Sequence, residues 1–102
     1  MSERELTPTA GVRLLLERDR VDGTRAHYRA SVITPDARHD GTAILDETGA
    51  HTLDVPAAPL ALAEPLAMLC KLIARAAAKR IADGLPAWPP RILRWRGPGR
   101  GA

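Results

Sequence analysis

Arg25-Ala-His-Tyr-Arg-Ala-Ser-Val-Ile-Thr34 is the stretch that decides the fold. Small or apolar side chains alternate along it with polar ones, and this period of two is typical of a half-buried β-strand. The side chains expected on the inner face are Ala26, Tyr28, Ala30 and Val32. We therefore predict a strand over residues 25–34, with that face against a hydrophobic core.

Three further short strands are predicted around this one. Residues 12–18 alternate in the same way, with Leu14 and Leu16 on one face, and short apolar stretches follow at residues 42–46 and 51–55. Turn-forming residues separate them: Asp22-Gly23, the segment 35–41, and Glu47–Ala50. Parallel crossovers need a dozen or more residues, so connections this short predict an antiparallel meander.

A long helix is predicted after the strands. From about Pro65 the apolar residues recur every three or four positions, ending at the helix-stop pair Asp83-Gly84. The predicted apolar stripe is Leu66, Leu69, Ile73, Ala77 and Ile81. Leu60–Glu64 is expected to be a separate helical turn, because a residue that precedes proline disfavours helical dihedral angles.

The expected fold class is therefore α+β: a four-stranded antiparallel β-meander packed by one long C-terminal α-helix. Residues 91–96 follow as a fifth strand or as a basic extended arm. The chain has 102 residues, enough for one domain, which we assign to residues 11–96. Residues 1–10 are expected to be a flexible leader and residues 97–102 a disordered Gly/Arg tail.

Several features of the sequence indicate the cellular compartment of the protein. The N-terminus lacks the basic start and apolar stretch of a secretory signal peptide. The longest uncharged run, Val55–Ala63, has nine residues, far fewer than a membrane-spanning helix needs. Cys70 is the one cysteine and cannot form an internal disulfide. We expect a bacterial cytoplasmic protein with no membrane partner.

Catalytic and metal-binding patterns are weak. The candidate metal ligands are His27, His39, His51, Asp36, Asp40 and Asp54. Their spacing does not place pairs on one turn or one strand face, as compact metal sites require. Cys70 is expected to be a small packing residue in the middle of the helix and not a reactive thiol. The sequence contains no nucleophile elbow and no phosphate loop. We predict no enzyme activity, metal or cofactor.

Charge is distributed unevenly along the chain. Residues 1–70 carry seven basic and eleven acidic side chains, and residues 71–102 carry eight basic and one acidic, so the two parts have net charges of −4 and +7. Such asymmetry favours an anionic partner for the C-terminal third.

Two groups of residues carry that charge. Lys71, Arg75 and Lys79 are four residues apart and must lie in one row on the helix, with Arg80 beside them. The candidates in the final segment are Arg91, Arg94, Trp95 and Arg96. Arg and Trp together can pair with phosphates and stack on bases. The alternative for the helix row is a solvated helix face. The alternative for the final segment is that Trp88 and Trp95 close one end of the core while the Arg side chains point to water. Of the two tryptophans, we expect Trp88 to be packed and Trp95 to be more exposed.

The strand order over about residues 12–84 is similar in layout to the single-strand nucleic-acid-binding folds of the whirly and Pur type. In those families a curved sheet binds the strand and the helix mediates dimer contact, which is what the resemblance implies here. It rests on layout alone, because no family motif is matched residue by residue.

The predicted function is that of a small non-enzymatic binding module. Its partner is expected to be nucleic acid or an acidic protein surface, contacted through the helix row and the final segment. The alternative is a self-associating structural or regulatory domain without a nucleic-acid role. A homodimer is expected from apolar residues on two faces, namely Ala74, Ala77, Ala78, Leu15 and Ile33.

Overall fold

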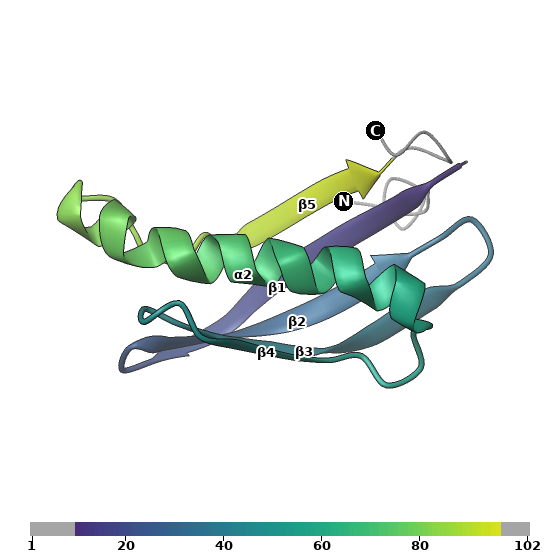
Figure 1. Ribbon diagram of the computed structural model, residues 1–102, viewed down its shortest axis with the longest axis horizontal. Coiled ribbons are helices and arrows are strands. Elements are labelled where there is room, and N and C mark those ends of the chain that lie inside the picture. Colours follow the sequence, from purple (N-terminus) through teal and green to yellow (C-terminus); the bar gives the residue numbers. More distant parts are fainter. Residues whose placement is uncertain (1–9, 97–102) are drawn as a thin grey trace.

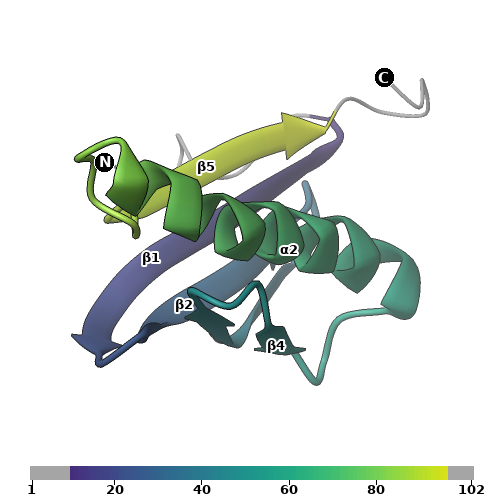
Figure 2. The ribbon, with the colours of Figure 1, turned by 60° about the vertical axis from the view of Figure 1, so that its left-hand side comes forward.

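The computed structural model describes residues 10–96, which form one antiparallel sheet and one helix, an α+β fold. The strands are β1 (Val12–Asp22), β2 (Arg25–Ile33), β3 (Arg38–Asp46), β4 (His51–Asp54) and β5 (Arg91–Arg96), and helix α2 (Leu60–Ala82) joins β4 to β5. The strand order is β4-β3-β2-β1-β5. Figures 1 and 2 show α2 across one face of the sheet and β5 beside β1 at its edge.

The final segment is a fifth strand and not an extended arm. β5 pairs with β1 along its whole length, from Glu17↔Arg91 to Val12↔Arg96. The sheet therefore has five strands where the meander alone predicted four. The leader over residues 1–9 and the tail over residues 97–102 lie outside the described residues.

Two strands are longer than predicted. β3 begins at Arg38 instead of Thr42, because the β2–β3 turn closes tightly: the Thr34 amide donates to the Ala37 carbonyl at 2.8 Å. Most of the predicted loop 35–41 is therefore strand. β1 continues to Asp22 through an irregularity between Arg18 and Arg20.

The helix is continuous from Leu60, so the prediction of a separate turn over residues 60–64 is wrong. Pro65 lies inside α2. The carbonyl that would accept from a residue at position 65 belongs to Ala61, which is exposed, so water can replace the lost hydrogen bond. Among residues 10–96, no helix combines the length and the hydropathy needed to cross a membrane.

Small side chains form the buried stripe of α2. The residues it buries are Leu66, Cys70, Ala74 and Ala77. Of the predicted stripe, Leu69 and Ile73 are only half-buried and Ile81 is 47% exposed. The sheet contributes bulky Tyr28 and Leu45 to the same core. Close packing then leaves room for small residues on the facing helix surface.

The loop between α2 and β5 is fastened by polar side chains. The Tyr28 hydroxyl donates to the Pro89 carbonyl at 2.7 Å, and Arg18 Nη1 donates to the Trp88 carbonyl at 2.8 Å. Arg80 Nε donates to the Pro86 carbonyl at 2.7 Å. Trp88 is 4% exposed and belongs to the core, as predicted. These contacts fix where β5 starts.

Alkaline pH is expected to destabilise the fold. Burial raises the pKa of the Tyr28 hydroxyl from 10.0 to about 12 and that of the Cys70 thiol from 9.0 to about 12. Between pH 9 and 12 the unfolded chain therefore loses protons that the folded chain keeps, and the free energy of unfolding falls. Urea unfolding at pH 8 and pH 11 measures this decrease in the free energy of unfolding.

The matched variants for that experiment are Tyr28→Phe and Cys70→Ala. Each is less stable at pH 8, Tyr28→Phe by about 1 kcal/mol for its lost hydrogen bond. Each should also lose less stability on going to pH 11 than the wild type. An equal loss in all three proteins would show that these groups do not cause it.

Candidate binding surface on α2 and β5

The helix row, Lys71, Arg75 and Lys79, lies on the exposed side of α2. The row is four-residue spaced, and the buried stripe of α2 faces the sheet on the other side. Lys79 Nζ lies 3.1 Å from an Asp83 carboxylate oxygen, in a pair where both side chains are at least half exposed. Such a pair contributes little to stability, so Lys79 can exchange Asp83 for another anion.

A groove lies between α2 and β5, with a volume of about 280 Å³. Its apolar lining includes Leu69, Leu72 and Ile73 from the helix and Ile92 from the strand. Arg80 and Arg94 also line it. Arg94 Nη1 donates to the carbonyl of its neighbour Leu93 at 3.1 Å. We call this the edge groove, because β5 is the last strand of the sheet.

Trp95 lies on the open face, the face of the sheet that α2 does not cover. Its register partner there is Arg13, whose guanidinium carbon lies 5.6 Å from the centroid of the indole ring. The indole Nε1 donates to the Ala10 carbonyl at 3.2 Å, and the side chain is still 54% exposed. Trp95 is thus more exposed than Trp88, as predicted, and is held by two contacts.

The structure does not bring the eight predicted residues together on one surface. Alternation along β5 places Arg91 and Trp95 on the open face and Arg94 on the helix side, with exposed Arg96 at the end of the strand. Arg91 Nε lies 4.0 Å from a Glu17 carboxylate oxygen. The helix row and Trp95 are therefore on opposite sides of the sheet, and a single contact area that includes both is excluded.

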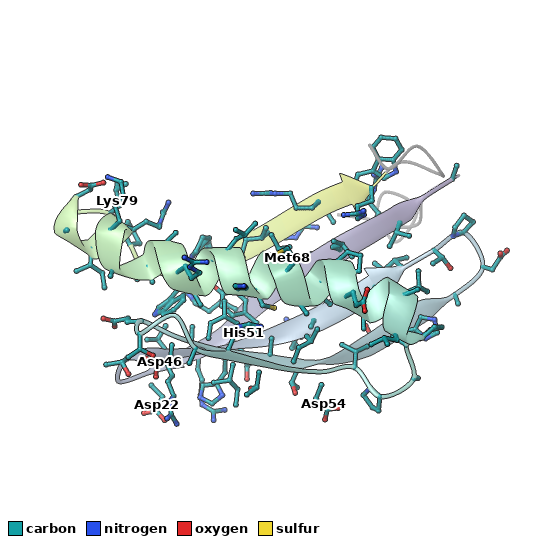
Figure 3. The ribbon with its side chains drawn as sticks, in the orientation of Figure 1. Asp22, Asp46, His51, Asp54, Met68 and Lys79 are labelled. Atoms are coloured by element: carbon teal, nitrogen blue, oxygen red, sulfur yellow. The ribbon has the colours of Figure 1, made fainter. Side chains whose placement is uncertain are left out.

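Sequence reasoning missed the exposed apolar residues beside the helix row. Met68 is 55% and Leu72 57% exposed. The sequence contained a usable signal for them. Met68 and Leu72 are four residues apart, so they form a second stripe on the helix, separate from the stripe of Leu66 and Cys70. Figure 3 shows Met68 on the outer side of α2.

Most acidic side chains of the described chain lie in β1–β4 and their turns, where arginines such as Arg25 lie among them. In Figure 3, Lys79 lies near the C-terminal end of α2, while Asp22, Asp46 and Asp54 lie along the opposite border, on the other side of the helix from β5. Asp46 accepts hydrogen bonds from the Thr48 amide and from Arg25 Nε, which lower the pKa of its carboxyl. Helix α2 and β5 together carry seven basic side chains and one acidic side chain, Glu64, with Asp83 at the C-cap of the helix, so these two elements are the cationic part of the described chain.

The candidate metal ligands are not gathered. No three His, Cys, Asp or Glu side chains among residues 10–96 are placed to hold one ion. Asp40 instead accepts from the Ser31 hydroxyl at 2.6 Å and from Arg38 Nε at 2.8 Å, which lower its pKa. Cys70 is fully buried, and burial raises the pKa of its thiol, which disfavours the reactive thiolate.

Comparison of the chain with protein-family models, with curated proteins and with solved structures finds no match. The similarity in layout to the whirly and Pur folds therefore receives no support from these comparisons. The function has to be inferred from the surface itself.

Proposed function

We propose that this protein is a non-enzymatic binding module that contacts the phosphate backbone of nucleic acid through the cationic side of α2 and β5. One observation carries the proposal. Between residues 71 and 96 there are seven basic side chains and one acidic side chain, Asp83.

The helix row has a spacing suited to an extended anion. Successive members are four residues apart, which is about 6 Å along a helix, so three charges cover about 12 Å. Like charges at this spacing repel one another weakly, so they do not stabilise the helix itself. A phosphate backbone relieves that repulsion and releases its counterions on binding.

The proposed contact set is smaller than the predicted one. It consists of Lys71, Arg75 and Lys79, with Arg80 and Arg94 across the edge groove. We leave out Trp95 and Arg91 because they lie on the open face, and Arg96 because it does not line the edge groove. Phosphate contacts carry no base information, so we expect little sequence preference.

Charge reversal at Arg75 tests the proposal. Arg75→Glu should weaken binding of a labelled single-stranded oligonucleotide by roughly tenfold and reduce the magnitude of the salt slope by about one. Arg20→Glu is the matched control, because it makes the same change in net charge at an exposed hairpin position. Its affinity should stay within about twofold of the wild type. Fluorescence anisotropy at about 50 mM salt measures both.

Equal losses in the two variants would mean that net charge alone governs binding and that α2 is no specific contact. Absence of binding by the wild type at tens of micromolar protein would refute the proposed function, because low salt favours even non-specific contacts.

Self-association is the less favoured alternative. The residues that indicated a homodimer are mostly used within the chain: Ala74 and Ala77 are 0% exposed, Leu15 is 1% and Ile33 is 2%. The exposed pair Met68 and Leu72 is bordered by the helix row. Across a two-fold axis through that pair, two copies would bring their like charges together.

A further inference from the structure

The outer edge of β5 has a defined backbone pattern. The Arg18 amide donates to the Pro90 carbonyl at 2.9 Å, and the same register continues into Glu17↔Arg91. Hydrogen-bonded and non-hydrogen-bonded pairs alternate along an antiparallel ladder. Residues 92, 94 and 96 therefore bond to β1, and residues 91, 93 and 95 direct their amides and carbonyls outward. The contact of Arg94 with the Leu93 carbonyl agrees with this assignment.

β1 leaves the charge of two β5 arginines without a carboxylate across the ladder. Glu17 lies opposite Arg91, whereas Arg94 and Arg96 lie opposite Leu14 and Val12. Within residues 10–96 the β1–β5 ladder therefore places no carboxylate opposite Arg94 or Arg96. A strand added at the outer side of β5 can supply one.

The edge groove offers apolar contacts to the same strand. Leu72 is 57% exposed and lines the groove together with Ile92, which is nearly buried at the base of β5. Side chains of a strand added at β5 would point alternately toward this groove and toward the open face. An apolar wall beside an unpaired strand edge is the arrangement used when a peptide extends a sheet.

We propose that the β5 edge binds an extended protein segment, rich in acidic and apolar residues, as a sixth strand. A second copy of β5 is a poor partner, because it would bring three more arginines and no carboxylate to this edge. Nucleic acid does not fit either, since it cannot continue a backbone ladder of amides and carbonyls. This site leaves out the helix row but shares Arg94 and the edge groove with the proposed nucleic-acid contact set. The inference does not depend on the proposed function.

The residues of β5 specify the segment. Complementary cross-strand pairs place acidic residues opposite Arg91, Arg94 and Arg96 and apolar residues opposite Ile92, Leu93 and Trp95. For an antiparallel segment the order from its N-terminus is acidic, apolar, acidic, apolar, apolar, acidic. The partner is therefore recognised by a pattern as well as by its charge.

The probe is a fluorescent peptide with the core Glu-Val-Glu-Val-Val-Glu between Gly-Ser flanks. Binding to the full-length protein is followed by anisotropy, with a scrambled peptide of equal charge as the control. Two further peptides carry N-methyl groups. One has them at the positions opposite residues 93 and 95, where the amides face β5. The other has them opposite residues 92 and 94, where the amides face away.

The protein variants are Leu72→Glu, in the edge groove, and Leu60→Glu, at the 74% exposed first residue of the same helix. We expect at least tenfold weaker binding for Leu72→Glu and for the peptide methylated opposite residues 93 and 95. The Leu60→Glu protein should bind the unmodified peptide with an affinity within about threefold of that of the wild type. The wild-type protein should bind the peptide methylated opposite residues 92 and 94 within the same range. Circular dichroism confirms that both variants are folded.

Three results would overturn the proposal. One is no binding of the peptide at millimolar concentration. Another is equal affinity for the scrambled peptide or for both methylated peptides. The third is displacement of the peptide by an oligonucleotide together with insensitivity to methylation, which would make the edge a general anion site.

Discussion

Trp88→Ala should lower the free energy of unfolding by about 3–5 kcal/mol, the cost of removing a buried aromatic side chain from a core. Trp88 is 4% exposed and shares the core with Ile92 and Tyr28. A domain of this size has a total stability of about 5–15 kcal/mol. The variant is therefore expected to be close to its unfolding midpoint at moderate temperature.

Trp95→Ala is the matched control, because it removes the same side chain at a site that is 54% exposed. We expect a loss of about 1 kcal/mol, from a cation–π contact with Arg13 and the hydrogen bond to Ala10. Urea unfolding followed by circular dichroism measures both variants. A larger loss for Trp95→Ala than for Trp88→Ala would contradict the assignment of Trp88 to the core.

Truncation after Pro86 extends the same argument. It removes Trp88, Ile92 and all of β5, and exposes the edge of β1 that β5 covers. It also removes the carbonyls that Arg18 and Tyr28 bind. We expect no cooperative thermal transition. A truncated chain that still melts cooperatively near the wild-type midpoint would mean that β5 is a dispensable arm.

The strands were predictable where local pattern decides them. In residues 25–32 the period of two is uninterrupted, and the register of β2 with β1 and β3 keeps Ala26, Tyr28 and Val32 in the core. Strand ends were less predictable, because they depend on pairing. Arg38 belongs to β3 through its partner Ile33, and its own sequence neighbourhood of Pro, Asp and His resembles a loop.

The buried side of α2 was not decided by the sequence. Leu66, Leu69 and Ile73 make the larger apolar stripe, and bulky apolar residues are usually buried. The alternative through Cys70 and Ala74 has the same helical spacing. The sheet selects it by contributing bulky side chains to the core, and this selection is a tertiary effect.

The charge of the candidate surface was predictable from the sequence, but the side of the sheet on which each of its residues lies was not. The net charge of residues 71–102 is independent of structure. Which side of the sheet each β5 residue takes depends on the register of β5 against β1, which sequence alone leaves open. The pairing Arg13↔Trp95 sends Trp95 to the open face, and Leu14↔Arg94 sends Arg94 to the helix side.

Affinity for single-stranded oligonucleotides should fall roughly 100-fold when the salt concentration rises from about 50 to about 200 mM. Four to six phosphate contacts on a single strand give a log–log slope of about −3 to −4, and a fourfold rise in salt then weakens binding by about 64- to 256-fold. The proposed contact set, with its five basic residues, matches that number of contacts without Trp95. Replacing Trp95 by Ala should therefore leave both affinity and slope unchanged within about twofold, whereas the loss of base stacking would cost about 1–3 kcal/mol.

Anisotropy titrations at four salt concentrations measure the slope for the wild type and for Trp95→Ala. A slope near zero would exclude phosphate contacts by the helix row. A loss of tenfold or more in Trp95→Ala would place the nucleic acid on the open face instead, with Arg13 and Arg91 as its cationic neighbours.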